Sequence, residues 1–237
     1  MEKIQFSIIV PVLHESDKID LLIDHLNSLE CREGSEIIVV DGSPELDTID
    51  AIRSEQVIKM KSAKGRGKQM NVGASVARGE ILIFLHADTE LPTGALRKIA
   101  SVVGQDKYVG GAFELGIKSE KFAHKSLARL ASIRCRLTRI PYGDQAIFIR
   151  RDYFKRIGGY KEIPLMEDVE LMRRIKHFGE KICIVPARVM TSPRRLQEEG
   201  FVYTSVRNTV LFSMYVLGVS PEKLAHFYKS EYRGSKA

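Results

Sequence analysis

Residues 65–88 read GRGKQMNVGASVARGEILIFLHAD, and this stretch decides the fold. Its first part predicts a helix over residues 69–77. Its second part predicts a buried strand over residues 80–85, because a short, uninterrupted apolar run is typical of a strand that is covered on both faces. An acidic residue, Asp88, follows closely after the strand. A helix that leads into a buried strand is one half of a parallel βαβ unit.

The same pattern occurs on the N-terminal side of this stretch. Residues 6–10 (FSIIV) and 36–40 (EIIVV) predict two more buried strands, and residues 57–58 suggest a short third one. Between the first two, apolar residues at helical spacing predict a helix over residues 16–29, with Ser16 as its N-cap. Alternating strands and helices indicate a parallel sheet with helices on both faces.

The organisation changes after residues 91–92. We expect helices over residues 93–103, 121–139, 152–157 and 167–177, strands over residues 109–115, 146–149 and 182–185, and helix from residue 197 onward with a break at Pro221. The strand over 109–115 alternates, which predicts an exposed or mixed-sheet position. The fold class is therefore α/β, with a mostly parallel central sheet flanked by helices and a helical C-terminal extension. We assign residues 1–195 to one domain, with halves 1–91 and 92–195, and residues 196–237 to the extension.

Composition excludes several classes of protein. The 237 residues are 44% hydrophobic and 28% charged, which rules out wholesale disorder and fibrous structure. The net charge of +7 suits phosphates, anionic lipid or nucleic acid, but no nucleic-acid motif accompanies it. The apolar segment 206–219 is too short to span a membrane.

Two further features indicate a cytoplasmic location. The cysteines, Cys31, Cys135 and Cys183, are odd in number and widely spaced, which argues against a disulfide framework or a zinc knuckle. The N-terminal residues lack the pattern of a signal peptide. We therefore expect a protein of the reducing cytoplasm.

Acidic residues follow three of the predicted parallel strands. They are Glu15, Asp41 and Asp88. Open parallel sheets bind ligands beyond the carboxyl ends of their strands, so we expect these carboxylates to lie together at one edge. The alternative for each acid taken alone is a helix cap or a turn former.

Five ordered segments resemble a known family. They are PVLHE (11–15), IIVVDGS (37–43), the opening stretch, GDQAIFIRRDYFKRIGGY (143–160) and MEDVELMRRIKHFG (166–179). Together they resemble the family 2 glycosyltransferases, which have the GT-A fold, over roughly residues 6–195. A narrower similarity is to a small bacterial subgroup of that family that carries HAD in place of the D-x-D motif.

The resemblance implies a nucleotide-sugar donor and a role for each matched residue on the donor side. Pro11 opens the first motif, Glu15 accepts hydrogen bonds from the ribose, and Asp41 accepts them from the nucleobase. Asp88 holds a Mg²⁺ or Mn²⁺ ion at the diphosphate. The basic residues Lys64, Arg66 and Lys68 either add positive charge nearby or form a solvated loop. Carboxylates and a cation are what such a donor requires. The resemblance favours a UDP-sugar as the donor, and a GDP-sugar is the other candidate.

The resemblance also implies an acceptor side. Asp168 is the candidate general base for an inverting transfer, and Glu167, Asp144 and Gln145 are candidate acceptor-binding residues. Adjacent helical residues point about 100° apart, so we expect only one of Glu167 and Asp168 to face the donor. The alternative is that these two acids only favour the positive helix N-terminus, and that Asp144 and Gln145 form a turn.

Three positions depart from the family pattern. His14 replaces the usual Asn, and His86 replaces the first Asp of D-x-D, so Asp88 is the one carboxylate left in that motif. His86 either has a structural role or binds metal or phosphate itself. Residues 193–196 read PRRL where processive relatives carry QxxRW, so we expect a non-processive enzyme.

The last helical region interleaves apolar residues with few charges. With the basic segment 121–139 it predicts a peripheral membrane surface at the inner face of the cell membrane, which suits a lipid-linked acceptor. Core packing or a homodimer contact is the alternative.

Two other functions stay open at this point. A sugar nucleotidyltransferase on a related sheet is one, although its phosphate loop is absent. A donor-binding protein without turnover is the other.

Overall fold

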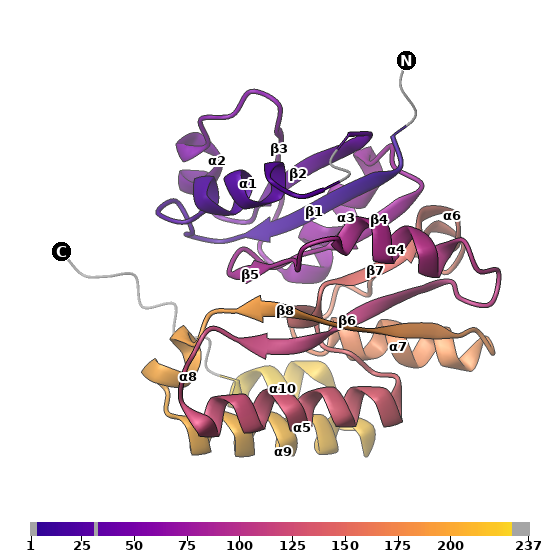
Figure 1. The fold of residues 1–237 in the computed structure, drawn as a ribbon. Helices are drawn as coiled ribbons and strands as arrows, with labels where there is room; N and C mark the ends of the chain where they lie inside the picture. The colour runs from indigo at the N-terminus through magenta and orange to yellow at the C-terminus, as the bar shows by residue number, and fades with distance from the viewer. Residues whose placement is uncertain (1–3, 31–32, 229–237) are drawn as a thin grey trace.

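The computed structural model describes residues 4–30 and 33–228, which form one mixed sheet with helices on both faces (Figure 1). The strand order is β3-β2-β1-β4-β7-β6-β8-β5. The strands are β1 (Phe6–Val12), β2 (Ser35–Asp41), β3 (Ile58–Lys61), β4 (Ile81–Phe84), β5 (Thr89–Glu90), β6 (Gly110–Ile117), β7 (Ile147–Arg150) and β8 (Ile182–Thr191).

The helices follow the strands in the predicted order. They are α1 (Ile19–Asn27), α2 (Asp47–Ala51), α3 (Arg66–Val76), α4 (Ala95–Val103), α5 (Phe122–Thr138), the short 3₁₀ turn η1 (Gly143–Gln145), α6 (Arg151–Arg156), α7 (Glu167–His177), α8 (Arg194–Glu198), α9 (Phe201–Val216) and α10 (Pro221–Phe227).

The sheet divides into a parallel half and a mixed half. Strands β3, β2, β1 and β4 are all parallel, so their carboxyl ends lie at one edge. Beyond β4, the strands β7 and β6 are antiparallel to their predecessors, β8 is parallel to β6, and β5 is antiparallel to β8. The fold class is confirmed, with more antiparallel pairing than the sequence suggested.

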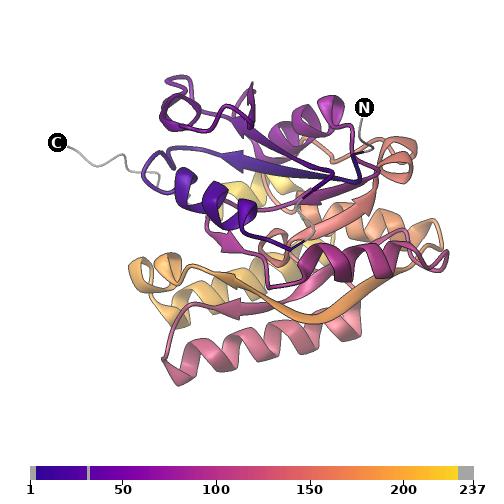
Figure 2. The same ribbon diagram turned by 45° about the horizontal axis from the view of Figure 1, so that its top comes forward.

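Each face of the sheet carries its own hydrophobic core. Even-numbered residues of β1, such as Ile8 and Val10, pack with α1 and α4, whereas Ile9 packs with α3 and α7 on the other face. This alternation follows from the two-residue repeat of a strand. Figure 2 shows the two helical layers with the sheet between them.

A buried ionic network fixes the amino ends of the parallel strands. Glu36 on β2 accepts hydrogen bonds from Ser7 Oγ at 2.7 Å and from Arg78 Nε at 2.9 Å, and Gly79 N donates to Ser7 Oγ at 2.8 Å. Burial alone would raise the pKa of Glu36, but the hydrogen bonds from Ser7 and Arg78 outweigh it and lower the pKa. These hydrogen bonds stabilise the amino ends of the strands. The three candidate acids, Glu15, Asp41 and Asp88, lie at the opposite end of the sheet.

Several local predictions need correction. The first helix begins at Ile19, because Lys18 and Ile19 donate their N–H groups to the Glu15 carbonyl in a turn, and Ser16 does not cap it. Helix α3 begins three residues before the expected start, at Arg66. Strand β6 is buried at every position, since it lies inside the mixed sheet between β7 and β8.

The C-terminal helices pack onto the main body. Leu211 of α9 and Leu224 of α10 are buried with Leu165, and they form a small core of their own. The division at residue 195 stays a prediction. Among the described residues no helix is long and apolar enough to cross a membrane. Cys135 and Cys183 are free thiols, and Cys31 lies outside the described residues.

Candidate functional site

The three strand-end acids lie at the same edge of the sheet, as predicted. Asp41 ends β2, Glu15 follows β1, and Asp88 follows β4, and these three strands are neighbours in the order β2-β1-β4. Pro11 lies within β1, opposite Val40 of β2. The edge where parallel strands end is the usual ligand-binding edge of an open sheet.

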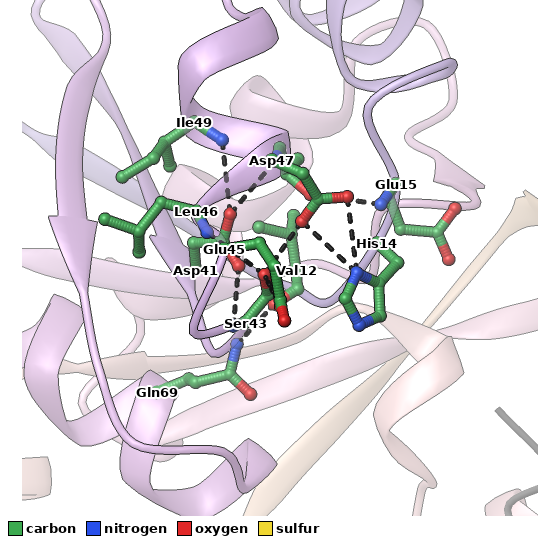
Figure 3. Close-up of polar contacts among 11 residues, drawn as sticks. Val12, His14, Glu15, Asp41, Ser43, Glu45, Leu46, Asp47, Ile49 and Gln69 are labelled. Atoms are coloured by element: carbon green, nitrogen blue, oxygen red, sulfur yellow. Dashed lines mark hydrogen bonds and ion pairs between the residues drawn. The ribbon is translucent and has the colours of Figure 1, made fainter. Parts of the chain in front are cut away.

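Asp41 is completely buried and organises the loop that follows it (Figure 3). Its Oδ1 accepts a hydrogen bond from Ser43 N at 2.8 Å, and its Oδ2 accepts from Thr48 N at 3.1 Å and from Ile49 N at 3.2 Å. These two N–H groups belong to the first turn of α2, where helical N–H groups lack partners. Both carboxylate oxygens are thus engaged in shaping the 42–49 loop.

His14 and Ser43 hold the same loop from the other side. His14 Nδ1 lies 3.3 Å from the Asp47 carboxylate, and Ser43 Oγ donates to Asp47 Oδ1 at 2.8 Å (Figure 3). Burial opposes ionisation of Asp47, but hydrogen bonds from Ser43 and His14 outweigh it and lower the pKa of this carboxyl. His14 therefore has a structural role in this loop.

Gln69 is a residue that the sequence analysis missed. Its Nε2 donates to the carbonyls of Val12 at 2.7 Å and Val40 at 2.8 Å, so it joins the ends of β1 and β2 to α3. A side chain at Gly42 would stand only 2.8 Å from Gln69 Cδ. The signal was present in the sequence, since an amide in the first turn of a buried helix needs buried partners.

Glu15 is paired with a residue far along the chain. Arg194 Nη2 lies 2.8 Å from Glu15 Oε1, and Arg194 Nη1 lies 3.4 Å from Oε2, which makes a two-pronged ion pair. The Glu15 side chain is 9% exposed. The PRRL segment therefore reaches the donor edge, so the predicted ribose acceptor sits beside a cation that sequence spacing could not reveal.

Arg66 connects the donor side to the acceptor side. It begins α3, and its Nη1 lies 3.8 Å from Glu167 Oε1 at the start of α7. The close approach depends on Gly67, where a Cβ atom would stand 2.6 Å from the Lys161 carbonyl oxygen. Burial, and next the charge of Asp168, raise the pKa of Glu167 to about 7, against the opposing effect of Arg66.

Asp168 is oriented by backbone donors. Its Oδ2 accepts from Gly143 N at 2.6 Å, and its Oδ1 accepts from Val169 N at 2.7 Å. Burial raises its pKa, although both hydrogen bonds and Arg66 oppose the shift. A Cβ at Gly143 would stand 2.8 Å from His86 Nε2 and 3.7 Å from Asp168 Oδ2, so the imidazole and this carboxylate flank one glycine. Arg66 thus pairs with Glu167 and opposes the rise in the pKa of Asp168 through its charge, and the expectation that only one of these acids faces the donor stays a prediction.

The acids of this region raise one another's pKa. Burial, followed by the charges of Asp168 and Asp88, raises the pKa of Asp144 to about 6, and Asp144 Oδ1 is buried without a hydrogen-bond partner among the described residues. Burial and the Arg66 guanidinium lower the pKa of His86 to about 4, despite the nearby Asp88. His86 is therefore a neutral imidazole at pH 7, with a nitrogen lone pair available as an acceptor or ligand.

These residues fit a divalent cation shared with a diphosphate. Within the described part of the chain, no three His, Cys, Asp or Glu side chains form a complete metal site by themselves. Mg²⁺ and similar ions are commonly held by only one or two carboxylates together with substrate phosphates and water. Asp88 supplies a carboxylate of this kind, and His86 is a neutral nitrogen donor near it.

Gln145 stabilises a turn, and both polar atoms of its side-chain amide are hydrogen-bonded. Its Nε2 donates to the Phe113 carbonyl at 2.8 Å, and its Oε1 accepts from Tyr142 N at 3.1 Å. The side chain is buried, so we no longer assign it to acceptor binding.

Arg134 of α5 is a second missed residue. Its guanidinium carbon lies 3.7 Å from the centre of the Tyr142 ring, and its Nη1 and Nη2 are buried with no hydrogen-bond partner among the described residues. Its charge opposes the rise in the pKa of Asp144. An unsatisfied guanidinium beside an unsatisfied carboxylate marks this place as unusual, because buried polar groups are normally paired.

Comparisons with known proteins agree with this architecture. The model for glycosyl transferase family 2 matches residues 7–161, more than half of the chain. One similar solved structure is a mannosyltransferase, PcManGT from Pyrobaculum calidifontis, in complex with GDP-Man and Mn²⁺. It is 19% identical, with a TM-score of 0.63 over 79% of this chain and 56% of that chain.

A second similar solved structure is GalNAc-T7 with UDP, GalNAc and Mn²⁺. It is 16% identical, with a TM-score of 0.60 over 80% of this chain and 44% of that chain. The chain thus spans about half the length of these relatives, and at this identity the likeness concerns the fold, which is GT-A. No curated protein matches the chain. The family model and the shared fold lead to one conclusion: the chain belongs to glycosyl transferase family 2.

Proposed function

We propose that this protein is a glycosyltransferase that moves a sugar from a nucleoside-diphosphate sugar to an acceptor hydroxyl or a lipid phosphate, with inversion and without processivity. The observation that carries the proposal is the meeting of Glu15, Asp41 and Asp88 at one sheet edge, with Arg66 bridging to Glu167. Membership of the family and the nucleotide sugars named for the two similar structures support it.

On the donor side, the loop shaped by Asp41 binds the base. Glu15 and Arg194 lie beside the ribose and the phosphates. Arg194 and Arg66 supply positive charge for the diphosphate, since guanidinium groups bind phosphate oxygens in pairs. Both arginines already interact with carboxylates, so a bound diphosphate shares them with Glu15 and Glu167.

A divalent cation, Mg²⁺ or Mn²⁺, completes the donor site in this proposal. Asp88 would hold it, with His86 as a second donor and the remaining ligands from the diphosphate and water. The cation, when bound, neutralises negative charge on the diphosphate leaving group.

Asp168 is the proposed general base. The acceptor oxygen attacks the anomeric carbon, its proton passes to the Asp168 carboxylate, and the bond from that carbon to the diphosphate oxygen breaks to release the nucleoside diphosphate. Hydrogen bonds from Gly143 and Val169 fix the carboxylate, and burial raises its pKa toward the range where a base is effective. Glu167 is less suited, because it is 5% exposed and pairs with Arg66.

Two other functions make different predictions. A sugar nucleotidyltransferase would form a nucleotide sugar from a nucleoside triphosphate and release pyrophosphate. A binding protein would hold the donor without turnover.

A thermal-shift panel tests the donor assignment. Nucleoside diphosphates and their sugars are compared with and without Mn²⁺, because ligands that bind the folded state raise its melting temperature by mass action. We expect stabilisation by UDP or GDP compounds that grows with Mn²⁺. No stabilisation by any nucleotide would contradict the proposal.

A further inference from the structure

The helices α5 and α9 run side by side on the side of the molecule opposite α1 (Figure 1). The rings of His124 and Phe201 are stacked 5.9 Å apart, and Arg134 lies 5.8 Å from the ring of Phe212. The two contacts are ten residues apart on α5 and eleven apart on α9, so the helices are parallel and in contact over several turns.

The outer sides of both helices expose large apolar side chains. We call this surface the α5–α9 face. It consists of Phe122, Leu130, Ile133 and Leu137 on α5 and Val202, Tyr203, Val206, Val210, Val216 and Leu217 on and just after α9. On α5 these side chains are between 53% and 82% exposed. A soluble monomer rarely leaves so many apolar side chains together in water.

The predicted apolar stripe of the C-terminal region thus serves two purposes. Leu211, Met214 and Tyr215 belong to or pack against the interior cores, whereas Tyr203, Val206 and Val210 are exposed. The sequence could not separate the two sets, because an apolar residue at helical spacing is compatible with either side.

The charges carried by α5 and α9 themselves have one sign. Residues 121–139 contain six Lys and Arg and no Asp or Glu, and residues 201–219 contain one Arg and no acid. On α5 the exposed Lys125, Arg129 and Arg136 lie along one flank of the apolar row. Lys125 pairs with the exposed Glu120, and exposed pairs of this kind are weak, whereas Arg136 pairs with Glu114, which is buried.

We infer that the α5–α9 face docks on an anionic lipid bilayer, with the apolar rows entering the headgroup region and the basic row contacting lipid phosphates. An apolar face flanked by Lys and Arg is the pattern of helices that lie in the membrane interface. A second copy of this chain is a poorer partner. A two-fold interface brings the same face of each copy together, and neither copy supplies an acidic row to meet the basic one.

The absence of tryptophan from the sequence permits a direct test. A single Trp at Ile133 reports on the α5–α9 face, and a single Trp at Leu21, 70% exposed on α1, is the matched control. Each full-length variant is mixed with vesicles of phosphatidylcholine alone or with 30–40% phosphatidylglycerol at low salt. We expect a blue shift of fluorescence for Ile133→Trp with anionic vesicles only, and none for Leu21→Trp.

Co-sedimentation with the same vesicles tests the residues. Lys125→Gln with Arg129→Gln should weaken binding about 30-fold, at about five-fold for each charge removed. Ile133→Ser with Leu137→Ser should weaken it at least as much, whereas Leu21→Ser should leave it unchanged. The inference is overturned if the parent does not bind anionic vesicles, or if all variants bind them equally. It is also overturned if the parent is a dimer that does not bind vesicles and the double variant Ile133→Ser with Leu137→Ser is a monomer.

Discussion

Replacing Asp41 by alanine should both destabilise the protein and remove nucleoside binding. The change leaves three N–H groups, those of the buried Ser43 and Thr48 and the part-buried Ile49, without their acceptor. At about 1 kcal/mol for each unsatisfied donor, the free energy of unfolding falls by about 3 kcal/mol. For a chain of this size that corresponds to a melting temperature lower by about 6–12 °C.

The assay is thermal unfolding followed by circular dichroism, together with the thermal shift produced by the best nucleoside and nucleoside diphosphate. Asp50→Ala is the matched control, because Asp50 is an exposed acid in the same helix, α2. It should change the melting temperature by little and leave nucleotide binding intact. For Asp41→Ala we expect loss of binding for nucleoside and diphosphate alike, since the 42–49 loop is the proposed base site.

Two results would refute this reasoning at different points. Unfolding of Asp41→Ala within about 1 kcal/mol of the parent would show that the three hydrogen bonds do not hold the loop. The expected destabilisation with loss of binding confined to the diphosphate would show that the loop is structural and the base binds elsewhere.

Three further predictions concern two acidic residues and one glycine of the site. Asp88→Ala should abolish the part of the nucleotide thermal shift that requires Mn²⁺, and equal shifts in parent and variant would remove Asp88 from metal binding. The pKa of Glu167 is raised from 4.5 to about 7 in the folded state, so the folded protein binds this proton more tightly than the unfolded chain does. The free energy of unfolding therefore falls as pH rises from about 4.5 to 7. Glu167→Gln should flatten that dependence in melting curves at pH 5 and 7.5, and an unchanged slope would contradict the shift. Gly143→Ala should lower transfer activity without loss of nucleoside binding, because the new Cβ would stand 2.8 Å from His86 Nε2; unchanged turnover would show that this spacing is unimportant.

The positions of the strand-end acids could be predicted from the sequence, because they depend on local patterns. Buried apolar runs place β1, β2 and β4, and neighbouring parallel strands then bring Glu15, Asp41 and Asp88 to one edge. The sequence could not show what each carboxylate contacts. The three donors to Asp41 come from the loop and helix after it, and the partner of Glu15 is Arg194, which is 179 residues away.

Residues with buried polar partners were the hardest to predict. The sequence indicates at most that an amide in a buried segment needs partners. It does not show that Gln69 and Gln145 bond main-chain carbonyls of distant strands, or that Arg134 stacks on Tyr142. Such roles follow from tertiary packing, which brings together segments whose spacing carries no signal. The same applies to Arg66, whose distance to Glu167 is set by the close packing at Gly67.

The most direct test of the account is release of nucleoside diphosphate from the nucleotide sugar that the binding panel selects. The parent and Asp168→Asn are compared with Mn²⁺ and an acceptor extract that contains both lipid-linked and hydroxyl acceptors. The account predicts release that depends on the acceptor, with transfer to a hydroxyl about 10²–10⁴ times slower in Asp168→Asn while donor affinity is kept. Tight binding of the donor without turnover in the parent would contradict it and identify a binding protein instead.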